Sequence, residues 1–140
     1  VLYHDEYGWN EEYEALIARI VADFIDRFDP ERERCWIAER DGATVGSVFV
    51  VKHPDREQVA KLRLLYVEPS ERGHGLGRRL VGEVTRFARH VGYRRITLWT
   101  NGVLLAARRI YEAEGYRLVD SARSRLFGHD LVGETWELEL

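Results

Sequence analysis

The chain has 140 residues, a net charge of −3 and 45% hydrophobic residues, which suits one domain with one core. No apolar run reaches the eighteen or so residues of a membrane span, and the acidic N-terminus is unlike a secretory signal. The one cysteine, Cys35, excludes an internal disulfide, and we expect a buried, inert thiol in a cytoplasmic protein. These features predict a single domain over residues 1–140.

Charge is distributed unevenly along the chain. Residues 1–34 contain ten acidic residues and four arginines, whereas residues 72–95 contain seven arginines and one acid, Glu83. We expect the basic part to hold phosphates and the acidic part to attract a cationic amine, although solvated helix faces explain both equally simply. The basic stretch is short and the pI is about 6, so a nucleic-acid partner is disfavoured.

The first half of the chain predicts one helix and three strands. Apolar residues recur at helical spacing over residues 11–28, Asn10 is a plausible N-cap, and Asp29-Pro30 ends the helix. Three antiparallel strands joined by turns follow; we expect them over residues 35–39, 44–51 and 58–67.

The second half predicts two helices among further strands. We expect helices over residues 78–91 and 103–114, and strands over residues 94–100, 116–119 and 135–140. Residues 121–133 read as a strand interrupted by a loop near Gly128. Because a strand–helix–strand crossover is right-handed, the strands 58–67 and 94–100 should be parallel. The fold class is therefore α/β (α+β), with a mixed central sheet.

The segment from Arg72 to Gly77 reads Arg-Gly-His-Gly-Leu-Gly between a strand and a helix. Free backbone N–H groups and the positive end of the helix dipole meet at such a turn, which predicts a site for a phosphorylated cofactor. Gly77 is followed by arginine, not by the Lys-Ser/Thr of a P-loop. The spacing G-x-G-x-G, with no acid near Tyr93, also excludes a dinucleotide fold. The alternative is a glycine turn with a structural role alone.

Several motifs resemble those of the GNAT acetyltransferases. Arg72, Gly75 and Gly77 match the family's pyrophosphate loop, (Gln/Arg)-x-x-Gly-x-(Gly/Ala). Leu65-Tyr66-Val67-Glu68-Pro69 resembles the strand end that precedes this loop. Ala107-x-x-x-Tyr111-x-x-x-Gly115-Tyr116 resembles the family's tyrosine helix, and Val45-Gly46-Ser47 a strand behind the site. The likeness covers nearly the whole chain and is weakest before residue 35 and in 121–133.

A narrower likeness is to the acetyltransferase domain that follows a MarR-type regulator in some bacterial fusion proteins. This likeness is found in residues 60–116 and 127–140. The chain starts at Val1 and contains no methionine, so we expect a piece of a longer chain with a possible fused regulatory domain.

The resemblance implies a reaction that moves an acetyl group from acetyl-CoA to a small-molecule or peptide amine, on a sheet splayed at the cofactor site. Tyr111 would be the acid that serves the departing thiolate. Many relatives have an asparagine where this chain has Leu104, and Asn101 is a possible substitute. The residues expected to bind the cofactor are Leu65, Tyr66, Val67, Arg72, Gly73, His74, Gly75, Leu76, Gly77, Arg78 and Asn101.

The base and the acceptor site stay open. Glu39, Glu68, His53, His129 and Glu134 are candidate bases, with Glu68 expected to be exposed. Tyr7, Trp9, Glu12 and the loop near His129 are candidates for the acceptor site. The second function considered is an acetyl-CoA-binding sensor with little catalysis, and no metal is expected. Exposed C-terminal strands make a homodimer a further expectation.

Overall fold

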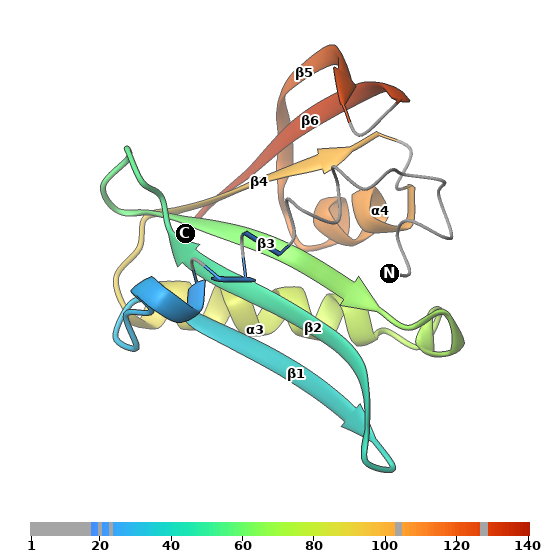
Figure 1. Ribbon diagram of the computed structural model, residues 1–140. Helices are drawn as coiled ribbons and strands as arrows, with labels where there is room; N and C mark the ends of the chain where they lie inside the picture. The colour runs from blue at the N-terminus through green and yellow to red at the C-terminus, as the bar shows by residue number, and fades with distance from the viewer. Residues whose placement is uncertain (1–17, 20, 23, 103–104, 127–128) are drawn as a thin grey trace.

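The computed structural model describes residues 18–19, 21–22, 24–102, 105–126 and 129–140 (Figure 1). As predicted, the described part of residues 18–27 is helical, and the helix ends before Asp29. The earlier part of that helix, the acceptor-site candidates Tyr7, Trp9 and Glu12, and Leu104 lie outside the described residues. No helix among the residues described has the length and apolar character needed to cross a membrane.

The described strands form one mixed sheet of six, in the order β1-β2-β3-β4-β6-β5. Their bounds are β1 Arg34–Arg40, β2 Ala43–Lys52, β3 Val59–Val67, β4 Arg95–Asn101, β5 Arg117–Leu126 and β6 His129–Glu139. The pair β3 and β4 is parallel, and the other neighbouring pairs are antiparallel. This confirms the predicted mixed sheet with an antiparallel N-terminal part and a parallel strand–helix–strand unit.

The C-terminal hairpin is longer than predicted. The strands expected at 116–119 and 135–140 extend into the stretch 121–133, and β5 pairs with β6 from Arg117 to Leu126. The prediction fell short because β5 is an edge strand. Its residues 117–123 are all exposed, so the alternation of buried and exposed residues that identifies a strand is missing.

Two helices pack on one face of the sheet, and the core lies beneath them. The helix α3 (Leu76–His90) buries Leu80, Val81, Val84, Phe87 and Ala88, as predicted from their spacing. They pack against strand residues of the same face, including Val48, Val50, Ala60, Leu62 and Ile96. The helix α4 (Leu105–Ala113) adds Tyr111 to this core. A short 3-10 turn, η1 (Pro69–Glu71), connects β3 to the glycine-rich loop before α3.

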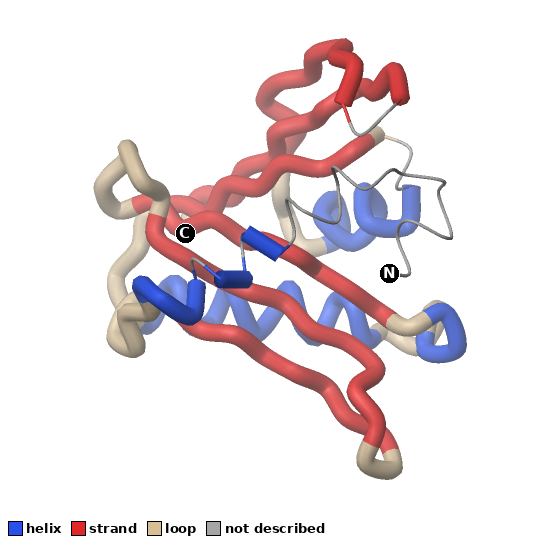
Figure 2. The backbone as a smooth tube through the Cα atoms, viewed as in Figure 1, coloured by secondary structure: helices blue, strands red, loops and turns tan. Residues whose placement is uncertain are grey.

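The strands β3 and β4 pair at one end and separate at the other. The ladder between them joins Val59–Lys61 to Arg95–Thr97 and extends no further, which confirms the expected splay. We call this paired part the closed end, and the remainder, Leu62–Val67 with Leu98–Asn101, the open end. Figures 1 and 2 show the two strands diverging from the closed end.

A bulge in β3 accompanies this separation. The register between β2 and β3 shifts between Ser47 and Phe49, which places one extra residue in β3. Leu64 lies in that interval and has φ of 53°, an uncommon conformation for a leucine. Since a bulge bends the strand that contains it, it directs the open end of β3 away from β4.

Candidate functional site

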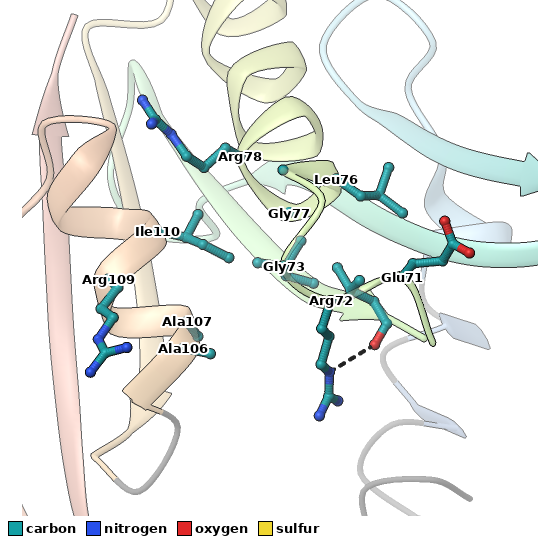
Figure 3. Close-up of a pocket in the computed structure, with 13 residues that line it drawn as sticks. Glu71, Arg72, Gly73, Leu76, Gly77, Arg78, Ala106, Ala107, Arg109 and Ile110 are labelled. Atoms are coloured by element: carbon teal, nitrogen blue, oxygen red, sulfur yellow. Dashed lines mark hydrogen bonds between the residues drawn. The ribbon is translucent and has the colours of Figure 1, made fainter. Parts of the chain in front are cut away.

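A pocket of about 360 Å³ lies at the open end, between β3, the glycine-rich loop and the two helices (Figure 3). One wall comes from the end of β3, a second from the loop and the start of α3, and a third from α4. The lining residues are Leu65, Val67, Glu71, Arg72, Gly73, Gly75, Leu76, Gly77, Arg78, Ala106, Ala107, Arg109 and Ile110. Of the eleven predicted cofactor residues, eight therefore meet around one pocket.

The loop end of this pocket has backbone features that favour an anion. Gly75 is the N-cap of α3 with φ of 80°, and no side chain caps the first turn. The first backbone N–H groups of a helix have no acceptor within the helix, and they coincide with its positive dipole end. Gly73 also has positive φ, and a Cβ added at Gly73 or Gly75 would meet no atom within 4 Å. The backbone is therefore open to a phosphate at both glycines.

Three arginines and one glutamate set the charge of the pocket. Arg72 donates from Nε to the carbonyl of Val67 at 3.3 Å, and Arg78 pairs with Glu114 of the turn after α4 at 3.1 Å. Arg109 is exposed on α4, and Figure 3 shows its side chain and that of Arg72 on opposite sides of the gap. The local balance is positive, as a diphosphate requires.

Glu71, the one acidic residue in the lining, binds an arginine of β1 that lies 31 positions earlier in the chain. Arg40 at the end of β1 donates from Nε to both carboxylate oxygens, at 3.0 and 3.1 Å, and its Nη2 lies 2.9 Å from Oε1. This fork-like contact keeps the negative charge of Glu71 compensated beside the anion site.

The other end of the pocket is apolar and narrow. Its lining there comes from Leu65 and Val67 of β3 and from Ala106, Ala107 and Ile110 of α4. The two helices approach each other closely at Gly77, where an added Cβ would lie 2.5 Å from Cδ1 of Ile110. The pocket therefore suits a ligand with a phosphorylated end and a slender, mostly apolar arm.

Tyr111 lies behind this apolar end. Its side chain is 4% exposed, so it belongs to the core and not to the pocket lining. Its ring centroid is 5.7 Å from that of Tyr116 and 6.4 Å from that of Trp136. Burial raises the pKa of Tyr116 far above its usual value. Ile110, the residue before Tyr111, lines the pocket directly.

The remaining predicted cofactor residues lie elsewhere. His74 is exposed and outside the lining, and Asn101 is 1% exposed at the end of β4. Tyr66 lies between two lining residues of an extended strand, so its side chain is on the opposite face of the sheet. Its hydroxyl donates to Oε2 of Glu68 at 2.6 Å. Glu68 is half-buried and its carboxylate accepts the Tyr66 hydrogen bond, so the expectation that it is exposed was wrong.

The structure separates the candidate bases. His53 lies in the turn after β2, beyond the closed end, and its Nδ1 accepts the backbone N–H groups of Asp55 and Arg56 at 3.0 Å each. Glu39 is exposed on the edge strand β1. Glu134 is buried on β6, 3.1 Å from Nε of Arg108, and accepts from Trp136 Nε1 at 3.2 Å. Of His129, the structure describes only the backbone, at the start of β6.

The predicted site residues did not include five of the lining residues, Glu71, Ala106, Ala107, Arg109 and Ile110. Ala107 belongs to the tyrosine-helix motif, and helical spacing leads from it to Ile110, three residues later, and from Ile110 to Ala106, four residues earlier. Glu71 follows the motif strand directly, but its pairing with Arg40 joins residues 31 positions apart and has no local signal.

The comparisons with known proteins agree with this geometry. The model of a family described as "Acetyltransferase (GNAT) family" matches residues 2–116. Human N-acetyltransferase 8 is 30% identical over 113 residues, which cover 78% of this chain and 50% of that protein. N-acetylaspartate synthetase of Xenopus tropicalis is 33% identical over 84 residues, which cover 60% of this chain and 31% of that protein. The chain thus spans half or less of the length of these two relatives.

Solved structures show the same fold. An acetyltransferase of the GNAT family from Streptococcus pneumoniae has a TM-score of 0.74 at 17% identity, covering 85% of this chain and 74% of that chain. A protein of Salmonella typhimurium, solved with its cofactor acetyl-CoA, has a TM-score of 0.73 at 19% identity, covering 94% and 78%. The likeness to regulator fusions stays a prediction. With the family model matched over most of its residues, the chain belongs to the GNAT acetyltransferase family.

Proposed function

We propose that this chain is an acetyl-CoA-dependent N-acetyltransferase that passes the acetyl group to a primary amine by direct attack on the thioester. The observation that carries the proposal is the continuity of the pocket. It runs from the N-terminus of α3, which has no side-chain cap, along apolar residues of α4 to the end of β3, where that strand no longer pairs with β4. A relative of similar fold was solved with acetyl-CoA.

The residues present fit the diphosphate, the pantetheine arm and the thioester of acetyl-CoA. The backbone N–H groups from Gly73 to Gly77 and the arginines Arg72, Arg78 and Arg109 would hold the phosphates. Leu65, Val67 and Ile110 would enclose the pantetheine arm. The arm's amides would add to the edge of β3 that no longer pairs with β4, in the manner of an added strand. A backbone N–H of Leu65 to Val67 would polarise the thioester carbonyl.

In the transfer, the amine nitrogen forms a bond to the carbonyl carbon and the bond from that carbon to sulfur breaks. The amine loses one proton to a base, and the sulfur gains one. Tyr111 would supply a hydrogen bond, and then the proton, to the departing sulfur. A neighbouring carboxylate or water would accept the proton of the amine; the carboxylate of Glu68 is the candidate at the open end.

A tyrosine pair provides the test. Tyr111→Phe should lower turnover at least about a hundredfold, the lower end of the range for a lost general acid, with little change in the Kd of acetyl-CoA. Tyr116→Phe is the matched control, because it removes a hydroxyl from a neighbouring buried ring. We expect its turnover to stay near that of the wild type. Turnover would be measured as release of free thiol with an amine panel.

Two outcomes would count against the proposal. Equal turnover of both variants would remove the acid role of Tyr111. If the wild-type chain binds acetyl-CoA but turns over none of the amines in the panel, the alternative of an acetyl-CoA-binding sensor would be favoured instead.

A further inference from the structure

Arg78 lines the pocket from the first turn of α3, but its charged end is directed away from the anion site. Figure 3 shows its guanidinium pointing away from Gly73 and Arg72. Its Nε and Nη2 lie 3.2 and 3.1 Å from one oxygen, Oε2 of Glu114 in the turn after α4. N–H groups that donate to this carboxylate are not available to a phosphate. Arg78 therefore has to leave Glu114 before these groups can bind the cofactor.

Within this pair, the carboxylate is the better fixed partner. The side chain of Glu114 is 20% exposed and that of Arg78 is 59% exposed. A Cβ added at Gly82 of α3 would lie 3.5 Å from Oε1 of Glu114, so the carboxylate lies against the helix at a position without a side chain. The backbone N–H of Glu114 also donates to the carbonyl of Ile110 at 3.0 Å. A change of partner is therefore a movement of Arg78, while Glu114 stays in place.

A second ion pair at the pocket has the opposite arrangement of charges. Glu71 belongs to the lining and its partner Arg40 does not, whereas Arg78 belongs to the lining and Glu114 does not. The Arg40 pair thus compensates a negative charge in the lining, and the Glu114 pair compensates a positive one. Since a diphosphate is bound by uncompensated positive charge, the Glu114 pair opposes the binding that the glycine-rich loop favours.

We propose that Glu114 competes with the phosphates of acetyl-CoA for Arg78 and thereby limits the affinity for the cofactor. In the unliganded chain the guanidinium binds Glu114, and in the complex it turns to a phosphate oxygen. Product CoA has the same phosphates, so Glu114 favours its release as well. This inference rests on the proposed function and deepens it by identifying an affinity-determining residue outside the pocket lining. The alternative is a brace, in which the pair keeps α3 and α4 in place around the pocket.

Glu114→Gln distinguishes the two by the sign of its effect. Calorimetry with CoA should show a Kd about twofold to fivefold lower than in the wild type, the range for an ion pair that no longer has to be broken. A brace predicts a higher Kd instead. Glu112→Gln is the matched control, because it removes the same charge from an exposed position of α4, and its Kd should stay near that of the wild type. An unchanged or higher Kd in Glu114→Gln, or an equal decrease in both variants, would overturn the competition.

A crystal structure of the wild-type chain with CoA tests the change of partner itself. We expect the Arg78 guanidinium within hydrogen-bond distance of a phosphate oxygen and separated from Glu114. An Arg78 that still binds Glu114 in the complex would overturn the inference.

The outcomes also separate this inference from the proposed function. If Glu114→Gln binds CoA more tightly but the wild type acetylates no amine, the proposed function fails and the competition stands. If the wild type acetylates amines and Glu114→Gln binds CoA no more tightly, the competition fails and the proposed function stands. If no CoA binds to the wild type at millimolar concentration, both fail.

Discussion

The two ends of the β3–β4 pair contain the same two strands but are held in different ways. At the closed end, three residue pairs form a parallel ladder, and the backbone N–H of Arg94 donates to the carbonyl of Gln58 at 2.8 Å. Arg56 and Arg95 bind Glu137 of β6 at 2.7 and 3.5 Å, and Arg95 also pairs with Glu139. At the open end a bulge, an apolar pocket and an exposed tryptophan replace these contacts.

This difference shows how the sheet tolerates an opening in its centre. The pairs β2–β3 and β4–β6, on either side of the opening, stay hydrogen-bonded along the open end. Each of the two separated strands therefore keeps one bonded neighbour. The closed end joins the halves, and α3 packs across β2, β3 and β4. The strand ladder and its ion pairs thus lie at one end of the strand pair, and the pocket lies at the other.

The largest effect is expected from a substitution in the glycine-rich loop at the open end. Gly75→Val should weaken acetyl-CoA binding at least about tenfold, since its side chain enters the space that a phosphate would occupy and disfavours the positive φ. Gly42→Val is the matched control, because Gly42 has φ of 82°, equally open surroundings, and a place in the β1–β2 turn. Both variants should lose about 1–2 kcal/mol of stability from strain. Calorimetry would show whether the control binds like the wild type, as we expect; equal losses of affinity would contradict an anion site at Gly75.

A smaller effect is expected from the charge balance beside that site. Arg40→Ala leaves Glu71 uncompensated in the pocket lining, and we expect the Kd of acetyl-CoA to rise roughly threefold to tenfold, about 1 kcal/mol of repulsion at a partly exposed position. Arg40→Ala combined with Glu71→Gln should restore the affinity. Arg86→Ala, which breaks the Arg86–Glu83 pair on the exposed side of α3, is the control. A double variant as weak as Arg40→Ala would show that the contact acts through the shape of the turn and not through charge.

The smallest effect is expected from a substitution at the closed end, where it should change stability and not binding. Burial alone would raise the pKa of Glu137, but hydrogen bonds from Arg56 and Thr97 and the charges of Arg56 and Arg95 lower it below its usual value. The pKa of Glu137 is lower in the folded chain than in the unfolded chain, where it is about 4.3. Its charged carboxylate therefore stabilises the fold above about pH 4.3, and this stabilisation is lost as the pH falls through the folded-state pKa. Glu137→Gln should therefore lose about 1 kcal/mol at pH 7 and little at pH 3, with the Kd of acetyl-CoA unchanged. Urea unfolding at both pH values measures this; an equal loss at both would show that the carboxylate charge is not responsible.

The sequence predicted the features that depend on residues close to one another in the chain. The spacing of Leu80, Val84 and Phe87 indicated the buried face of α3, and the Gly73–Gly77 loop indicated where the structure has a pocket. The helix begins at Leu76, two residues before the predicted start, because Gly75 itself is the N-cap. The parallel strand pair followed from chain connectivity, which a strand–helix–strand order largely determines.

Features that depend on distant residues could not be predicted in this way. The edge strand β5 has no buried face to give it a pattern, and the Arg40–Glu71 contact joins β1 to η1. The contact between the edge of the Trp99 ring and Gly133 requires the register of β4 with β6, which the sequence alone does not reveal. Glu68 was expected to be exposed because its position before Pro69 does not reveal its hydrogen bond with Tyr66.

Amide hydrogen exchange with and without acetyl-CoA tests the central claim most directly, because it observes both ends of the strand pair at once. Saturating acetyl-CoA should slow exchange across Gly73–Arg78 and Leu62–Val67, and should leave Val59–Lys61 and Arg95–Thr97 as they were. No slowing at millimolar acetyl-CoA, or slowing confined to the closed end, would contradict the account.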